Sequence, residues 1–400
     1  MFKASTGLSI EEDAHGAGVE AALQAIKGLS GARPQILFVF ATSKLDQGAL
    51  LQGVNSVADG PLIVGASTAG EISQDGPMTR HSVVVMALAS DTAHFFAGIG
   101  TGIKEDAGKA GRDAANALKT AAGGDEIKLV ITINDVLAGN GSEVIRGMQE
   151  VFGQHFPIVG GSAGDDAAYK QTYQYLGNKV FSGAAICIGL TGDFKYSVGV
   201  NHGWIPVGTS MRVTKSEGSV IHELDGQPAI NIYESYLGPE NTAEMKNKVL
   251  AEISVSYPLG MQIKDNDELL LRAPFFVDDK GSITCGGEVP EGTDVRLMIG
   301  SKEDAVIAAS NAAKHAQEQL GGDPQAILVF SCHVRDKLFV TKERAKEEID
   351  AIKDVLSHQT PLIGFYTYAE QAPLGGEVRN IEKCNSALHN ETVVVLVLGT

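Results

Sequence analysis

This chain of 400 residues lacks several common features, and each absence excludes a class of protein. Its four cysteines lie far apart without a C-x-x-C pair, so neither a zinc module nor a redox dithiol is expected. The ten histidines form no H-x-x-x-H or H-E-x-x-H motif, so a protein-bound metal has no support. No apolar run approaches the ~18 residues of a membrane span, and the N-terminus lacks the apolar stretch of an export signal. We therefore expect a soluble protein of the reducing cytoplasm, with no role in a membrane.

Basic residues are also scarce relative to acidic ones. Lys and Arg total 32 against 49 Asp and Glu, a formal net charge of -17, and no local basic patch offsets it. Because such a charge repels phosphate backbones, nucleic acid is not an expected partner. Hydrophobic residues make up 44% and charged residues 20%, as in globular proteins, and the length fits two or three domains of roughly 150 residues.

A pattern that recurs three times organises the chain. The triplet Glu-Asp-Ala, which begins at Glu12, Glu105 and Glu303, is followed each time by an Ala-rich stretch of helical composition. A continuous apolar run comes 22 to 24 residues after the alanine, at 36–40, 129–133 and 327–330. Intervals that agree this closely across loops favour an internal repeat over chance.

Each copy continues through a second helical segment into a proline-led strand and ends on one more apolar run. The proline-led strands are 61–65, 157–160 and 361–364, and the final runs are 83–86, 184–188 and 393–397. Continuous apolar runs are typical of parallel strands buried on both faces, and a strand, a crossover helix and a second strand form a βαβ unit. We therefore predict an α/β fold of three repeated α-β-α-β-β units that form mostly parallel sheets covered by helices.

The copies are not evenly spaced along the chain. Copies one and two are contiguous over residues 1–192. A strand-rich segment, 193–294, precedes copy three, which occupies 295–400. We therefore predict two domains, 1–192 and 193–400; order along the chain leaves open whether the units share one sheet.

Three loops after the proline-led strands are candidate ligand sites, because open parallel sheets bind ligands outside the carboxyl ends of their strands. Loops 65–71, 160–166 and 364–370 begin with glycine, which allows close backbone approach, and carry hydroxyls and a terminal carboxylate. The alternative is that the glycines only form tight turns and bind no ligand. This alternative is weakest for the third loop, because its two large tyrosine side chains are unusual in a simple turn. The candidate ligand-binding residues are Ser67, Glu71, Ser162, Asp165, Tyr366, Tyr368 and Glu370.

The strand beside the third loop ends in Phe330-Ser331-Cys332-His333-Val334-Arg335. Arg335 can grip a carboxylate and Glu370 can take an ammonium, so the pair suits an amino acid or a similar small zwitterion. An ordinary salt bridge between these two side chains is the alternative. Cys332 is a further candidate, since a neighbouring cation lowers a thiol pKa; a buried, inert cysteine is its alternative.

One catalytic motif needs weighing. Gly160-Gly161-Ser162-Ala163-Gly164 fits the G-x-S-x-G pattern of a hydrolase nucleophile elbow and follows a strand. An elbow requires an amphipathic helix directly after the serine, whereas the residues that follow here favour an irregular loop or a strand. We therefore predict no catalytic residue and keep a serine hydrolase as an alternative.

Five stretches in the same order resemble the FIST family. They are 61–72, 223–229, 275–279, 330–335 and 364–370. The resemblance covers nearly the whole chain, with a FIST_N-like domain over 1–192 and a FIST_C-like domain over 193–400. Val334 and Ala369 stand where the family tends to have glycine, and Gln371 stands where it has an aliphatic residue.

The resemblance implies a sensory role, because FIST regions occur alone or joined to histidine kinases and chemoreceptors, with amino acids among the suggested ligands. One branch of similar proteins binds haem, responds to nitric oxide and acts on a histidine kinase. If this chain is similar to that branch, His202 beside Trp204 is a possible axial ligand; a turn histidine is the alternative. We therefore predict a non-enzymatic cytoplasmic sensor that binds a small polar metabolite, uses no cofactor and signals to a partner protein. A haem-based nitric-oxide sensor and a serine hydrolase are the alternatives.

Overall fold

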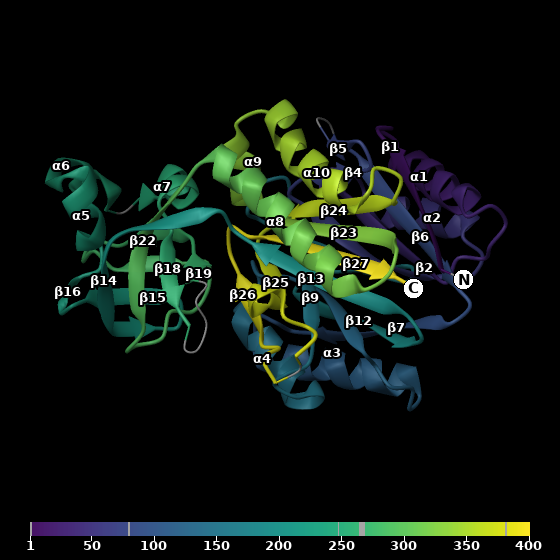
Figure 1. Cartoon of the computed structure of the whole chain (residues 1–400), viewed down its shortest axis with the longest axis horizontal. Coiled ribbons are helices and arrows are strands. Elements are labelled where there is room, and N and C mark those ends of the chain that lie inside the picture. Colours follow the sequence, from purple (N-terminus) through teal and green to yellow (C-terminus); the bar gives the residue numbers. More distant parts are fainter. Residues whose placement is uncertain (1, 79–80, 247, 264–268, 381) are drawn as a thin grey trace.

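The computed structural model describes residues 2–78, 81–246, 248–263, 269–380 and 382–400 (Figure 1). Three stretches share one element order of strand, helix, strand, helix, strand and final strand. The first comprises β1 (Phe2–Ser9), α1 (Ala14–Gly28), β2 (Ile36–Thr42), α2 (Gln47–Val57), β3 (Leu62–Thr68) and β6 (Val83–Ser90). The second comprises β7 (Ala93–Thr101), α3 (Ala107–Ala122), β8 (Leu129–Asn134), α4 (Gly141–Phe152), β9 (Ile158–Ser162) and β12 (Ala184–Gly192). The third comprises β13 (Lys195–Asn201), α8 (Lys302–Leu320), β23 (Pro324–Cys332), α10 (Lys342–Leu356), β24 (Leu362–Thr367) and β27 (Val393–Gly399).

The Ala-rich helices begin where the Glu-Asp-Ala triplets indicate. The side chains of Asp13 and Asp106 accept backbone hydrogen bonds at the starts of α1 and α3, and Ser301 does so at α8. Small residues let each helix lie directly on the first strand of its repeat. A Cβ atom on Gly199 of β13 would lie 1.8 Å from the carbonyl oxygen of Ala312 in α8, and Gly7 and Gly98 are crowded in the same way by α1 and α3.

The predicted α/β class is confirmed, but the prediction of mostly parallel sheets is wrong. Within each repeat one pair of strands is parallel: β2 with β3, β8 with β9, and β23 with β24. The first and last strands of each repeat join the sheet antiparallel. The continuous apolar runs did not identify parallel strands. In β6, for example, every residue from Val83 to Ala89 is buried although the strand is antiparallel to its neighbours. Cover on both faces, rather than strand direction, explains such a run.

Both faces of each sheet are covered by apolar side chains. One face packs on the helices of its own repeat: α1 and α2, α3 and α4, or α8 and α10. The opposite faces of the three sheets meet in one shared core, to which β2, β8 and β23 contribute Phe38, Ile131 and Leu328. Each such side chain contributes about 1.5–3 kcal/mol by burial, so this core stabilises the association of the three repeats.

The repeats also exchange short strands in a cycle. After its loop, the first repeat sends β4 (Glu71–Ser73) to pair with β24 of the third, followed by β5 (Gly76–Pro77). The third repeat sends β25 (Glu370–Pro373) to β9 of the second, followed by β26 (Ser386–His389). The second sends β10 (Gln174–Leu176) to β3 of the first, followed by β11 (Lys179–Phe181). This exchange brings the three loops to one place.

The described residues between 204 and 300 form a separate unit between β13 and α8, with a nine-stranded sheet and its own apolar core (Figure 1, teal to green at the left). The chain enters it through β14 (Trp204–Glu217) and leaves through β22 (Asp294–Gly300). The third repeat therefore begins at β13 rather than at residue 295, and the predicted division at 192 and 193 falls between β12 and β13. The remaining elements are β15 (Val220–Leu224), β16 (Gln227–Pro228), α5 (Asn231–Leu237), α6 (Pro239–Met245), β17 (Lys248–Val249), α7 (Ala251–Ser256), β18 (Leu259–Gln262), β19 (Leu269–Arg272), β20 (Pro274–Val277) and β21 (Ile283–Cys285).

Candidate functional site

The three loops predicted as ligand sites meet at the carboxyl ends of the parallel strand pairs. Together we call loops 65–71, 160–166 and 364–370 the junction. Each loop donates at least one backbone N–H to a carbonyl oxygen of another loop, and three of these bonds tie the loops in a ring. These bonds run from Gly164 N to Ser67 O (2.9 Å), from Ala69 N to Tyr366 O (3.0 Å) and from Tyr368 N to Ser162 O (3.3 Å). A displacement of one loop therefore strains its bonds to the other two.

Glu71 and Glu370 occupy equivalent positions and are held in the same way. Each accepts a hydrogen bond from the threonine three residues earlier and one from the residue that precedes the last strand of its repeat. The donors are Thr68 and Ser82 for Glu71, and Thr367 and Thr392 for Glu370. Burial raises the pKa of Glu71 to about 7 and that of Glu370 to about 8. Each carboxyl therefore joins its loop to the segment just before the last strand of the same repeat.

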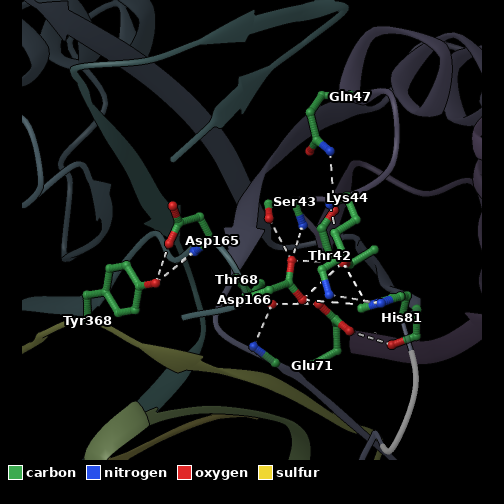
Figure 2. Close-up of polar contacts among 12 residues, drawn as sticks. Thr42, Ser43, Lys44, Gln47, Thr68, Glu71, His81, Asp165, Asp166 and Tyr368 are labelled. Carbon is green, nitrogen blue, oxygen red and sulfur yellow. Dashed lines mark hydrogen bonds and ion pairs between the residues drawn. The ribbon is translucent and has the colours of Figure 1, made fainter. Parts of the chain in front are cut away.

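Asp166 lies at the same offset in the loop of the second repeat, but it turns to the first repeat instead (Figure 2). In the strand pairing, Gln174 takes the place of Glu71 and Glu370 in that repeat. The carboxylate of Asp166 accepts hydrogen bonds from Thr42 Oγ1 (2.9 Å), Ser43 N (2.8 Å) and Ser43 Oγ (2.6 Å), and lies 3.7 Å from His81 Nδ1. Lys44 Nζ lies 3.1 Å from His81 Nε2. The His81 side chain is 55% exposed and that of Asp166 is 14% exposed. We call Thr42, Ser43, Lys44, His81 and Asp166 the Asp166 cluster; it is a polar site open to solvent.

Asp165 makes different contacts from Asp166, the next residue in the chain. Its carboxylate accepts the hydroxyl hydrogen of Tyr368 (Figure 2). It also accepts three backbone N–H groups, those of Tyr169, Lys170 and Gln171. Although burial acts to raise it, these hydrogen bonds together lower the pKa of Asp165 below its ordinary value. Asp165 therefore curls the loop after β9 and fixes the ring of Tyr368.

Arg335 is placed differently from the prediction. It is fully buried, and its Nε atom donates to Glu348 Oε1 (2.7 Å), its Nη2 atom to Ala305 O (2.8 Å) and its Nη1 atom to His202 O. The predicted pairing with Glu370 is wrong, because the strand ends at Cys332 and helix α9 (His333–Phe339) begins at the next residue. The helical turn aims Arg335 at α8 and α10, where it joins elements of the third repeat.

The remaining predicted residues are buried in the junction or, for Cys332, at the end of the neighbouring strand β23. Burial raises the pKa of the Cys332 thiol well above its ordinary value, as expected of an inert cysteine. Ser67 Oγ donates to Gly164 O (2.7 Å). Ser162 Oγ donates to Asn134 Oδ1 (2.6 Å), an amide oxygen that cannot act as a general base, and a loop rather than a helix follows it. Tyr366 is buried under Lys342, whose Nζ lies 4.8 Å from the ring centre.

His202 lies where β13 of the third repeat leads into the nine-stranded sheet, and its ring bonds to residues of that sheet. Its Nδ1 accepts the backbone N–H of Trp204 (2.9 Å), and a further hydrogen bond joins the ring to the backbone of Leu269. Burial lowers its pKa to about 4. Trp204 faces the guanidinium of Arg335, which lies 5.8 Å from the ring centre. These contacts occupy the groups that a haem would need in the predicted arrangement.

Several polar residues of the site were not predicted from the sequence. Thr42, Ser43 and Lys44 lie at the end of the first parallel strand, where Thr42 pairs with Thr68 as Cys332 pairs with Thr367 in the third copy. The comparison of strand ends that singled out Cys332 could have found them. His81 precedes the last strand of the first repeat and carried no sequence signal.

Other features of the described residues do not compete with the junction. A surface hollow of about 850 Å³ lies near Pro34, Pro61 and His94, at the amino ends of β2 and β3, opposite the strand ends that usually bind ligands. Within the described ranges, no three His, Cys, Asp or Glu side chains gather as metal ligands do. No helix in this part of the chain is long and apolar enough to cross a membrane.

Known proteins similar to this chain include three uncharacterized ones. A protein of Methanocaldococcus jannaschii is 29% identical over 80% of this chain, which spans 64% of the length of that relative. A protein of Mycobacterium tuberculosis strain H37Rv and its counterpart in strain CDC 1551 are 24% identical over 98% of both chains.

Solved structures are similar only at a low level. A cyanuric acid hydrolase from A. caulinodans aligns over the full length of both chains with 9% identity and a TM-score of 0.37. The PurL protein of Thermotoga maritima in complex with ADP aligns over 100% of this chain and 71% of its own with 12% identity and a TM-score of 0.24. Likeness at this level assigns no function.

Family models match most of the chain. The FIST N domain matches residues 35–227 and the FIST C domain matches residues 229–373. Together these ranges include all three loops of the junction and the Asp166 cluster. The chain therefore belongs to the FIST family of sensory domains.

Proposed function

We propose that this FIST protein is a non-enzymatic cytoplasmic sensor that binds a small, amino-acid-like ligand at the Asp166 cluster and signals to a partner protein. The observation that carries the proposal is the composition of this cluster. A lysine ammonium, an imidazole and a carboxylate lie together at a partly exposed position between two repeats. These groups complement the carboxylate and the ammonium of an amino acid.

The ligand would engage the cluster from the solvent side. Its carboxylate would bind Lys44 Nζ, which is exposed, and its ammonium would bind Asp166. Hydrogen bonds from Thr42 and Ser43 now satisfy Asp166, so a ligand ammonium competes with them for the carboxylate oxygens. The polarity that was predicted for Arg335 and Glu370 is thus present at Lys44 and Asp166.

This competition gives a route from binding to signal. Asp166 belongs to the second repeat, whereas Thr42 and Ser43 belong to the first, so the ligand acts on a bond between repeats. A ligand shifts an equilibrium between two arrangements by its difference in affinity for them. The ring of backbone bonds in the junction connects this change to the third repeat.

The partner and the compartment are part of the same proposal. Because the chain resembles FIST proteins that act on histidine kinases, we propose a histidine kinase as the partner. All four cysteines are unpaired and buried, which agrees with a reducing cytoplasm. The partner would read the relative positions of the repeats, because those positions respond to the ligand.

Isothermal titration of the whole chain with each of the common amino acids tests this proposal. We expect at least one to bind, and we expect Lys44→Met to weaken that binding by about ten-fold or more, since an exposed ion pair with a ligand is lost. Lys346→Met is the matched control, because Lys346 is also an exposed lysine and pairs with Asp350 on α10. Equal affinities of wild type and Lys44→Met would remove the cluster from the site, and no binding by any amino acid would overturn the ligand class.

A further inference from the structure

His333, the first residue of α9, is buried without a hydrogen-bond partner. It is 4% exposed, and neither ring nitrogen has a partner among the described residues. Burial lowers its pKa to about 4, so the ring is neutral at physiological pH and presents one donor and one acceptor. Buried polar groups are nearly always paired with protein, water or a ligand. The unpaired imidazole therefore points to a missing partner.

Two tyrosine rings contact the ring of His333. The rings of Tyr169 and Tyr368 stack with centroids 4.7 Å apart and an interplanar angle of 15°. Each meets the His333 ring edge-on, with centroid distances of 6.4 Å and 6.1 Å. The three rings form a small aromatic cluster that includes Tyr368 of the junction and no residue of the Asp166 cluster.

The two tyrosines are held very differently. Tyr368 is nearly buried, and Asp165 fixes its hydroxyl. Tyr169 is 53% exposed and has a φ of +52°, and Asp166 and Ala167 of the same loop also have positive φ. A residue with a side chain is disfavoured in this region of backbone conformation. The ring of Tyr368 is thus held in place, whereas the ring of Tyr169 is more than half exposed and loses little burial when its side chain rotates into solvent.

We propose that Tyr169 occupies a binding site for a small planar ring that carries a hydrogen-bonding group. When Tyr169 swings out, the ligand stacks on Tyr368 and its polar group pairs with His333. Phenols and nitrogen heterocycles are the chemical classes that satisfy both contacts. This site does not depend on the proposed amino-acid site, although Asp165 and Asp166 place both on one loop.

Replacement of the resident ring by a free one tests this proposal. Tyr169→Gly removes the phenol and suits the positive φ, so the variant should fold, as circular dichroism can verify. We expect it to bind p-cresol, which is the tyrosine side chain, about ten-fold or more tightly than the wild type does in isothermal titration. Tyr236→Gly is the matched control, since Tyr236 of α5 is 47% exposed and lies in the separate sheet domain.

Chemical modification of His333 supplies a second readout. Diethyl pyrocarbonate should modify His333 faster in Tyr169→Gly than in the wild type, and p-cresol should slow this reaction. In Tyr169→Gly/His333→Phe the affinity for p-cresol should fall again, because the hydrogen bond is lost. The proposal is overturned if Tyr169→Gly binds p-cresol no better than Tyr236→Gly does. The amino-acid titrations do not involve these residues, so either proposal can fail alone.

Discussion

The same loop occurs three times in this molecule, and its acidic residue behaves in two ways. In the first and third repeats the acid, Glu71 or Glu370, is buried and bonded to the threonine three residues before it. In the second repeat Asp166 crosses to another repeat and reaches solvent. Glu71 and Glu370 begin the exchanged strands β4 and β25, whereas the chain curls after Asp165 and β10 begins only at Gln174, eight residues after Asp166. The open polar site thus lies where the repeats stop being equivalent.

The third repeat shows the opposite arrangement. Its charged groups, Arg335 with Glu348, are fully buried and satisfied by protein partners. Such groups hold elements together and are closed to a ligand. A charged residue at the end of a strand is therefore a binding candidate only where the local fold leaves it open.

The largest effect should come from removing the buried ion pair between Arg335 and Glu348. We expect Arg335→Ala to lower the free energy of unfolding by about 3–5 kcal/mol, because Glu348 would remain buried without its counter-charge. Urea unfolding followed by circular dichroism measures the loss. Lys44→Met, on the exposed side, should change stability by no more than about 0.5 kcal/mol. If Arg335→Ala were as stable as the wild type but unable to bind an amino acid, Arg335 would belong to the ligand site and this account of it would be wrong.

A smaller effect should distinguish the buried acids by pH. Since burial raises the pKa of Glu370 to about 8, the folded protein keeps a proton that the unfolded chain loses near pH 4.5. Each such group should therefore lower the stability by about 1 kcal/mol per pH unit as the pH rises from 6.5 towards its folded-state pKa. Glu71, whose pKa is raised to about 7, contributes only to the lower part of this range.

Glutamine variants separate these two contributions. Glu370→Gln should flatten the decline in stability between pH 7 and 8, whereas Glu71→Gln should alter mainly the part below pH 7. An opposing slope below about pH 7.5, which the wild type and both variants share, comes from three buried histidines that are charged only in the unfolded chain, because burial lowers their pKa values in the folded state. They are His202, His333 and His389. The same slope in both variants and the wild type would contradict the assignment of these carboxyls.

Local patterns explain how much of the fold was predictable. The Glu-Asp-Ala triplets located three helix starts, and the loops after the proline-led strands located the junction. The exchange of short strands was not predictable, because β10 pairs with β3 about a hundred residues earlier in the chain and no local pattern encodes its partner. The antiparallel strands were missed because burial on both faces gives them the same apolar composition as parallel ones.

The site was predictable only in part for the same reason. Ser67, Glu71, Ser162, Asp165 and Tyr368 lie in the junction as placed by the loop pattern. Asp166 meets Thr42 across 124 residues, a contact that follows from tertiary structure alone. Arg335 was misplaced because a helix begins at His333, and a single residue of helix changes the direction of every side chain after it.

Hydrogen exchange by mass spectrometry, with and without the amino acid that binds most tightly in the titrations, tests the central claim most directly. The open side of the junction should respond: backbone exchange should change in peptides that cover residues 42–47 and 165–173, which carry the Asp166 cluster and the curl after it. Peptides that cover 333–339, around Arg335, should exchange as before. A change confined to the third repeat, with residues 42–47 and 165–173 unaffected, would contradict the account.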